Sequence, residues 1–195
     1  MNPALAVLAL SAFLLMFVLP KVFFRSDGSM NLRWWITATP FGLSFWGVGM
    51  AWLGVSPRLR GIGGEAAVAL DIAGMILLVG SIAMMAATMA TNRVPLALWH
   101  QDGTQNQPRQ IVTYGPYRWV RHPFYVSFIL LTLGAALITR DAITAAAFPL
   151  ALLSLDWTVR NEEKKLLASP LGDEYGAYRA RTGRFMPRLT DLVSR

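Results

Sequence analysis

The sequence contains no cysteine and only two histidines, His100 and His122. The absence of cysteine excludes disulfides, thiolate metal sites and cysteine nucleophiles, and two histidines are too few for a histidine-based metal centre, so we expect no bound metal. Charged residues are also scarce, at 15% of the chain, whereas 54% of the residues are hydrophobic. Soluble proteins carry about 25% charged residues, so little polar surface would remain to cover a soluble globule.

The hydrophobic residues are gathered in blocks that carry almost no charge. Three blocks, 1–20, 34–57 and 72–92, have the length of about 20 residues at which a helix crosses a bilayer. Two shorter blocks follow, 123–139 and 142–155, and the last reaches residue 159 if Asp156 is tolerated. A bilayer requires every backbone group to be hydrogen-bonded, and no block alternates like a barrel strand. The sequence therefore predicts an all-α fold, a polytopic membrane helix bundle with about five transmembrane helices.

Only Arg140 and Asp141 separate the last two blocks, so we expect helices four and five to form a tight hairpin. Downstream, apolar residues at helical spacing predict amphipathic C-terminal helices that lie on the membrane. No basic residue precedes the first block, which favours a membrane helix over a cleaved signal peptide. We expect a single domain, 1–195, in which residues 1–110 form the first three membrane helices and a loop, and residues 111–188 form a second region.

The basic residues are distributed unequally between the two sides of such a bundle. With five helices, one side receives only Arg58, Arg60 and Arg140, and the other receives the remaining fifteen of the eighteen lysines and arginines. The positive-inside rule then predicts a cytoplasmic C-terminus and an external N-terminus, in an inner or cytoplasmic membrane. The excess positive charge is placed to meet anionic lipid headgroups. We therefore expect membrane lipids as partners and no nucleic acid.

The densest motif is G-P-Y-R-W-V-R-H-P-F-Y, at 115–125. Gly115-Pro116 is a turn signal, and Pro123 fits the first turn of a helix. Two interpretations remain open on these residues alone. Aromatic and basic residues commonly anchor a helix end at the membrane interface, or Arg121 and His122 could face an anionic ligand at the start of the helix. The polar segment 91–110 leads into the motif, and we expect part of it to cover a ligand.

A second cluster, R-N-E-E-K-K-L-L, occupies 160–167 just after the fifth block. Its spacing allows Asp156 and Arg160 to pair on one helix face. The cluster could be an ordinary charged helix end. Alternatively, Glu162 and Glu163, which are expected at the same membrane face as His122, could present a carboxylate to a cationic ligand.

Together these clusters resemble a known family. G-P-Y-R-x-V-R-H-P-x-Y, followed by E-E-x-x-L, G-x-E-Y-x-x-Y and R-F-x-P, is similar to the isoprenylcysteine carboxyl methyltransferase family, and the phospholipid methyltransferases share the R-H-P and E-E elements. The resemblance covers about residues 112–187. It departs from the phospholipid enzymes in one respect, because the preceding helix has only the separated glycines Gly74 and Gly80 in place of a G-x-G element.

The resemblance implies an integral membrane methyltransferase that uses S-adenosylmethionine and a lipophilic acceptor, with 111–188 as the cofactor-binding catalytic region and a cytoplasmic active site. It implies cofactor binding and catalysis by two overlapping sets of residues. The cofactor-binding set is Tyr117, Arg121, His122, Pro123, Tyr125, Glu162 and Glu163, and the catalytic set is His122, Glu162, Glu163 and Arg160. The prediction depends on His122 and the two glutamates converging at the inner leaflet.

The chemistry of these residue types is compatible with that cofactor. Arg121 or His122 could meet its carboxylate, Glu162 or Glu163 its ammonium, and aromatic rings its adenine or sulfonium. Two other functions remain open: a membrane reductase of the sterol reductase type with a nicotinamide cofactor, and a non-catalytic membrane subunit. Nothing in the sequence identifies the methyl acceptor or the oligomeric state.

Overall fold

The computed structural model describes residues 2–17, 28–56, 59, 61–91 and 111–188. All regular elements in these segments are helices, which confirms the predicted all-α fold. They are α1 (Pro3–Phe17), α2 (Leu32–Leu53), α3 (Gly64–Thr91), the short 3₁₀ helix η2 (Gly115–Arg118), α4 (Pro123–Thr139), α5 (Ala142–Leu167) and α6 (Gly172–Arg181). The segment that was expected to cover a ligand lies, apart from Thr91 itself, outside the described residues.

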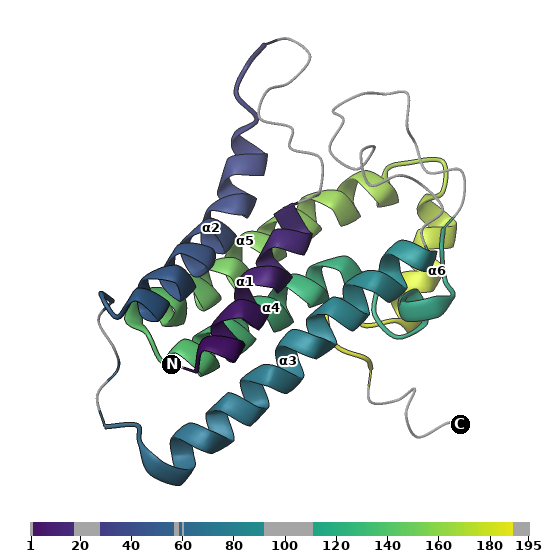
Figure 1. Cartoon of the computed structure of the whole chain (residues 1–195). Helices are drawn as coiled ribbons and strands as arrows, with labels where there is room; N and C mark the ends of the chain where they lie inside the picture. Colours follow the sequence, from purple (N-terminus) through teal and green to yellow (C-terminus); the bar gives the residue numbers. More distant parts are fainter. Residues whose placement is uncertain (1, 18–27, 57–58, 60, 92–110, 189–195) are drawn as a thin grey trace.

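The long helices form a bundle of two main pairs (Figure 1). α3 packs along α4, α2 packs along α5, and α4 and α5 also contact each other. α1 lies across α2, α3 and α4. The interior is apolar, and its fully buried side chains include Phe13, Leu78, Leu131 and Leu155. In a bilayer these side chains exchange lipid contacts for protein contacts, so close packing, and not removal from water, would hold α4 and α5 in position.

Glycines allow the closest helix contacts. A Cβ atom on Gly74 of α3 would lie 2.6 Å from Ile138 and 2.9 Å from the carbonyl oxygen of Gly134 on α4. On α2, a Cβ atom on Gly47 would lie 2.7 Å from Thr144 of α5. Gly80 is different, because its nearest neighbour would be 3.9 Å away. Of the two glycines noted in the sequence, only Gly74 is required for backbone approach.

Arg140 and Asp141 alone connect α4 to α5, and the tight membrane hairpin of these two helices stays a prediction. Arg140 adopts a left-handed conformation (φ 49°) and ends α4. Asp141 caps α5, because its carboxylate accepts hydrogen bonds from the backbone N–H groups of Ile143 and Thr144. Arg140 also forms an ion pair of 2.6 Å with Asp71 on α3. These contacts hold the end of the bundle that lies away from the R-H-P motif.

The start of α3 and the end of α5 differ most from the sequence expectation, and α2 covers Leu32–Leu53 where 34–57 was expected. α3 begins at Gly64, earlier than the charge-free block at 72, because Asp71 is neutralised by Arg140 within the bundle. α5 continues past Val159 to Leu167. The charged end of α5 is built from Glu, Lys and Leu, which favour helix, and Asp156 and Arg160 pair on its surface as predicted. The glutamate pair therefore belongs to α5 itself.

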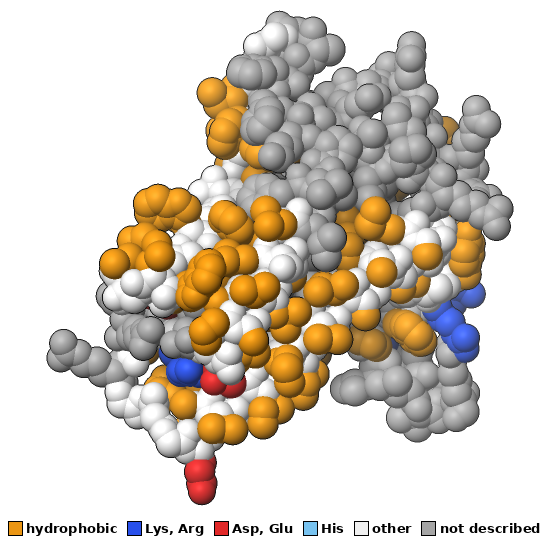
Figure 2. All heavy atoms as spheres, in the orientation of Figure 1, with side chains coloured by type: hydrophobic (Ala, Val, Ile, Leu, Met, Phe, Trp, Pro, Cys, Tyr) orange, Lys and Arg blue, Asp and Glu red, His pale blue; other side chains and the backbone are white. Residues whose placement is uncertain are grey.

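Two of the helices, α3 and α5, are long and apolar enough to span a membrane. Only 22% of the apolar window of α3 is buried inside the bundle, so within the described residues most of its surface is not covered by other helices. Large hydrophobic side chains such as Trp46, Ile76 and Leu153 are exposed on α2, α3 and α5, and hydrophobic atoms cover much of the visible face (Figure 2). α1 and α4 are apolar but shorter than a full span. The number of five spanning helices stays a prediction.

Candidate active site

The R-H-P motif lies where α3 ends, α4 begins and α6 packs on α5 (Figure 1). Gly115 has a positive φ of 60°, and a side chain there would meet Thr91 at the end of α3. Pro116 then starts η2, and Pro123 occupies the first turn of α4, where its missing N–H costs no hydrogen bond. His122 is the residue at the N-cap of α4. The two prolines and Gly115 thus fix the backbone on either side of Arg121 and His122.

The C-terminal segment 182–188, here called the strap, is hydrogen-bonded to this motif. The backbone N–H of Arg121 donates to the carbonyl of Gly183 at 2.8 Å, and the N–H of His122 donates to the carbonyl of Arg184 at 3.2 Å. In α6, the Tyr178 hydroxyl donates to the carbonyl of Tyr117 at 2.6 Å. The motif and the end of the chain therefore form one structural unit, although about 60 residues separate them.

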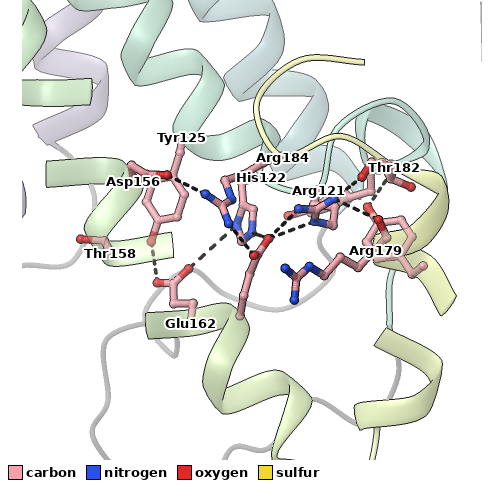
Figure 3. Close-up of polar contacts among 12 residues, drawn as sticks. Arg121, His122, Tyr125, Asp156, Thr158, Glu162, Arg179, Thr182 and Arg184 are labelled. Carbon is pink, nitrogen blue, oxygen red and sulfur yellow. Dashed lines mark hydrogen bonds and ion pairs between the residues drawn. The ribbon is translucent and has the colours of Figure 1, made fainter. Parts of the chain in front are cut away.

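The structure brings His122 and the two glutamates together. His122 Nε2 lies 3.4 Å from Glu163 Oε1, and its Nδ1 lies 4.0 Å from Glu162 Oε2. In Figure 3, His122 lies between Glu162 on α5 and Arg121. His122 is almost completely buried, and its ring stacks on that of Tyr125 with 5.8 Å between the ring centroids. The convergence on which the sequence argument depended is therefore present in the geometry.

Glu163 is surrounded by cations. Its Oε1 atom accepts from Arg121 Nε at 3.0 Å and lies 2.9 Å from Arg121 Nη2. Its Oε2 atom accepts from Nη2 of Arg184 in the strap at 2.9 Å. Arg184 also bonds Asp156 at 2.6 Å, and Arg121 also donates to backbone carbonyls at the end of α6. Glu163 and Arg121 thus mainly tie α4, α5, α6 and the strap together (Figure 3).

Glu162 is more accessible, with 20% of its side chain exposed against 3% for Glu163. Its Oε1 atom accepts from the hydroxyl of Tyr125 at 2.6 Å and from Arg33 Nη2 at 3.3 Å. Its Oε2 atom faces His122 at the longer distance of 4.0 Å. Of the adjacent glutamates, Glu162 therefore retains more capacity to accept hydrogen bonds from a ligand.

Three buried polar atoms around Glu163 have no hydrogen-bond partner in the described part of the chain. They are His122 Nε2, the Tyr175 hydroxyl and Arg184 Nε. The short distance from His122 Nε2 to Glu163 lacks hydrogen-bond geometry. Because an unsatisfied buried polar group costs about 1–3 kcal/mol, three at one place suggest a site that a polar ligand or water completes.

Burial also affects the tyrosines of α6. It raises the pKa of Tyr175, with the Glu163 carboxylate as the next contribution. Burial likewise raises the pKa of Tyr178, with Tyr175 as the next contribution. Both phenols are therefore neutral at physiological pH and available as donors. The pKa of Arg184 is also raised, since the charges of Glu163 and Asp156 outweigh the opposing effect of burial.

The other predicted site residues have different surroundings. Tyr117 and Pro123 are buried beside His122, where they shape the motif. Arg160 lies on the exposed side of α5 and pairs with Asp156 at 2.6 Å. It is not among the residues that contact His122, Glu162 or Glu163 in the described structure. Sequence reasoning missed four residues at the site: Arg33, Asp156, Tyr175 and Arg184. The R-F-x-P element pointed to Arg184 and G-x-E-Y-x-x-Y to Tyr175, without a stated role.

A bundle with two helices long enough to span a membrane, large hydrophobic side chains exposed on α2, α3 and α5, and a buried charged cluster at one end is typical of a membrane protein with a polar site. The family model of the isoprenylcysteine carboxyl methyltransferase (ICMT) family matches residues 74–168, which run from α3 to the end of α5. Over this region the chain is similar to that family, which supports the resemblance carried by the motifs.

Three curated relatives are similar to part of the chain. The cobalt-zinc-cadmium resistance protein CzcN of Cupriavidus metallidurans and the nickel-cobalt-cadmium resistance protein NccN of Alcaligenes xylosoxydans xylosoxydans are each 33% identical over 111 residues, 56% of this chain and 50% of the relative. The protein-S-isoprenylcysteine O-methyltransferase of Schizosaccharomyces pombe is 31% identical over 85 residues, 44% of this chain and 36% of the relative. The match thus spans half or less of each relative.

Proposed function

We propose that this chain is a membrane-embedded S-adenosylmethionine-dependent methyltransferase that acts on a lipophilic acceptor. The observation that carries the proposal is the meeting of His122 with Glu162 and Glu163 at one end of the bundle. The cluster falls within the region that matches the isoprenylcysteine carboxyl methyltransferase family. We propose a cytoplasmic location for this end, from the positive-inside distribution. Residues 111–188 would be the cofactor-binding catalytic region.

The relatives support the proposal to different degrees. The name of the Schizosaccharomyces pombe relative states an O-methyltransferase reaction on an isoprenylcysteine. The names of the two resistance proteins state a resistance and no reaction, so they neither favour nor oppose methyl transfer. The proposal therefore depends on the family match and on the site.

The polar groups of the site fit the amino-acid part of S-adenosylmethionine. That part carries an ammonium and a carboxylate, which require acceptors and donors close together. Glu162 offers a partly exposed carboxylate with an oxygen at the rim of the cluster. The Tyr175 hydroxyl and Arg184 Nε are donors without a partner in the described structure. We therefore assign the ammonium to Glu162 and the carboxylate to Tyr175 and Arg184, in preference to Arg121, whose donors are already bound to Glu163 and the end of α6.

The remaining residues would orient this site. When bound, the cofactor supplies a methyl group on a positively charged sulfonium, which an acceptor displaces in line. The protein's contribution is mainly to hold donor and acceptor in that geometry. Tyr125 and His122 provide aromatic faces close to Glu162 on which a cation can lie. Glu163, Arg121 and Arg184 keep α5, α4 and the strap in register.

The acceptor would reach the site from the bilayer. The outer faces of α2, α3 and α5 carry exposed hydrophobic side chains, so a lipophilic molecule can lie against them while it stays in the hydrocarbon of the bilayer. A carboxylate acceptor needs no general base. An amine acceptor must lose a proton, which His122 or Glu162 could take. A prenylated carboxylate and a lipid amine are both compatible with this site.

Binding of S-adenosylhomocysteine to the purified protein in detergent or nanodiscs, measured by isothermal titration calorimetry, tests the proposal. We expect micromolar-range affinity (about 8 kcal/mol), and loss of binding in His122→Ala and Glu162→Ala. Methyl-label transfer to total lipids and hydrophobic metabolites, with mass identification of the product, would identify the acceptor. A folded wild-type protein that does not bind would overturn the proposal.

A further inference from the structure

Arg33, at the start of α2, lies outside the family match yet contacts the site. The matched region begins at Gly74. Arg33 Nη2 nevertheless lies 3.3 Å from Glu162 Oε1, across 129 residues of sequence. The same nitrogen donates to the backbone carbonyl of Thr158 at 3.1 Å, one turn before Glu162 on α5. Arg33 thus contacts both the helix that carries Glu162 and the carboxylate itself.

Arg33 occupies a position at which its positive charge destabilises α2. Asn31 caps this helix, so Arg33 is the second helical residue. A cation in the first turn opposes the helix dipole, which favours negative charge there by about 0.3–1 kcal/mol. No acidic residue in the first turn compensates for this. A residue that violates a local preference in this way is often retained for another purpose, and Glu162 is the acidic group that Arg33 contacts.

Arg33 and Tyr125 hold the same oxygen of Glu162. Tyr125 donates to Oε1 from α4 at 2.6 Å, and Arg33 reaches Oε1 from α2. With Oε1 occupied from two helices, the carboxylate cannot rotate without breaking a charge-assisted hydrogen bond. Its Oε2 atom is then turned toward His122. Neither donor alone fixes both the position and the rotation of this group.

We infer that Arg33 is a positioning residue, which anchors Oε1 of Glu162 from α2 so that Oε2 is presented to the ammonium group of the bound cofactor. The inference rests on the proposed function. It assigns a role at the site to the N-terminal part of the chain, beyond the region that matches the family. Arg33 acts through Glu162 and does not itself contact the cofactor.

The matched variants Arg33→Gln, Arg33→Lys, Thr37→Val and Arg181→Gln test this role. Thr37 lies one turn after Arg33, and its hydroxyl lies 2.8 Å from the hydroxyl of Thr158, so Thr37→Val loosens the same α2–α5 contact without touching Glu162. Arg181 is exposed in α6, so Arg181→Gln removes an equal charge elsewhere. The measured quantities are the dissociation constant of S-adenosylhomocysteine and the melting temperature.

We expect Arg33→Gln to weaken binding about tenfold, which corresponds to one charge-assisted hydrogen bond. Arg33→Lys restores part of the affinity, because a lysine keeps the charge but not the planar donor pair. Thr37→Val lowers the melting temperature and leaves the affinity unchanged, and Arg181→Gln changes neither. In a Glu162→Gln background, Arg33→Gln has no further effect on any residual binding.

The outcomes separate the two proposals. Wild-type protein that does not bind S-adenosylhomocysteine overturns both. Wild-type binding with an unchanged dissociation constant in Arg33→Gln overturns the role of Arg33 alone, as does a loss of equal size in Thr37→Val. If Arg33→Gln does not fold, Tyr125→Phe replaces it, since it removes the other donor to Oε1, and Arg33→Lys still reports on the geometry.

Discussion

Arg121 and Glu163 form an ion pair of 2.9 Å in which only 6% and 3% of the two side chains are exposed. Glu162, the next residue, has 20% of its side chain exposed and makes a looser ion pair with Arg33. Adjacent residues on one helix point to different sides, so their carboxylates face different partners. We therefore expect the two glutamates to have different roles: Glu163 stabilises the structure, and Glu162 is the residue proposed to bind the ligand.

Glu163→Gln and Glu162→Gln are expected to separate the structural role of Glu163 from the proposed binding role of Glu162. Glu163→Gln leaves Arg121 buried without its counter-charge, which costs about 3–5 kcal/mol and lowers the melting temperature by about 6–20 °C. Glu162→Gln changes the melting temperature little but abolishes binding of S-adenosylhomocysteine. Thermal unfolding and titration calorimetry on the same preparations measure both effects. Equal losses of stability in the two variants would contradict the assignment.

Removal of single tyrosine hydroxyls in α6 provides a second matched pair. Tyr178→Phe removes the donor to the carbonyl of Tyr117 and should cost about 1 kcal/mol of stability. Tyr175→Phe removes a buried hydroxyl without a partner in the described structure, so stability should be unchanged or higher. We expect Tyr175→Phe to weaken binding of S-adenosylhomocysteine instead. Unaltered affinity in that variant would remove Tyr175 from the carboxylate site.

The same two phenols predict a dependence on alkaline pH. Burial raises the pKa of Tyr175 and Tyr178 above the ordinary value of about 10. Each therefore holds its proton more tightly in the folded protein than in the unfolded chain. Their contribution to stability is complete below about pH 10 and is lost as the pH rises through the higher folded value. Tyrosinate absorbance of the folded protein should show late-titrating phenols, with one fewer in each of the Tyr175→Phe and Tyr178→Phe variants; titration of all tyrosines together in folded protein would refute this.

The contact between α3 and α4 should depend on Gly74 but not on Gly80. Gly74→Ala places a methyl group against Ile138 and the backbone of Gly134, and the two helices must separate, at a cost of about 1–3 kcal/mol. Gly80→Ala meets only Leu130 at 3.9 Å, and alanine favours helix by about 1 kcal/mol over glycine. Melting temperatures of the two variants should therefore move in opposite directions. A rise in both would mean that the helices are not this close.

Local signals in the sequence predicted much of the helical frame. Pro123 marks the start of α4, and Arg140 and Asp141 mark the break before α5, because prolines, caps and charges act on their immediate neighbours. The end of α5 was placed too early. Hydrophobicity falls after Leu155, but the helix is continued by its own Asp156–Arg160 pair and by the strap. Charge along a helix that leaves the apolar core is therefore a poor indicator of its end.

The site was predicted only in part, because sequence motifs report mainly on their immediate neighbours. The motifs placed His122, Glu162 and Glu163 near one another because each ends or begins a neighbouring helix. Arg33 was read only as a charge that orients the chain, since its partner lies 129 residues away and no local pattern links them. The burial of Arg121 by Glu163 also depends on the packing of α6, which periodicity does not determine. Roles that arise from packing between distant segments could therefore not be predicted from the sequence.

The unbroken course of α5 has a mechanical consequence. Its 26 residues form one continuous helix of about 39 Å, with Pro149 inside it, from the Asp141 cap to the end that carries Glu162. The number of residues between the Asp141 cap and Glu162 therefore sets the direction in which the Glu162 carboxylate points around the helix axis. One alanine inserted in the middle of α5 would turn the distal end by about 100° and swing Glu162 away from His122 while every residue of the cluster remained in the chain.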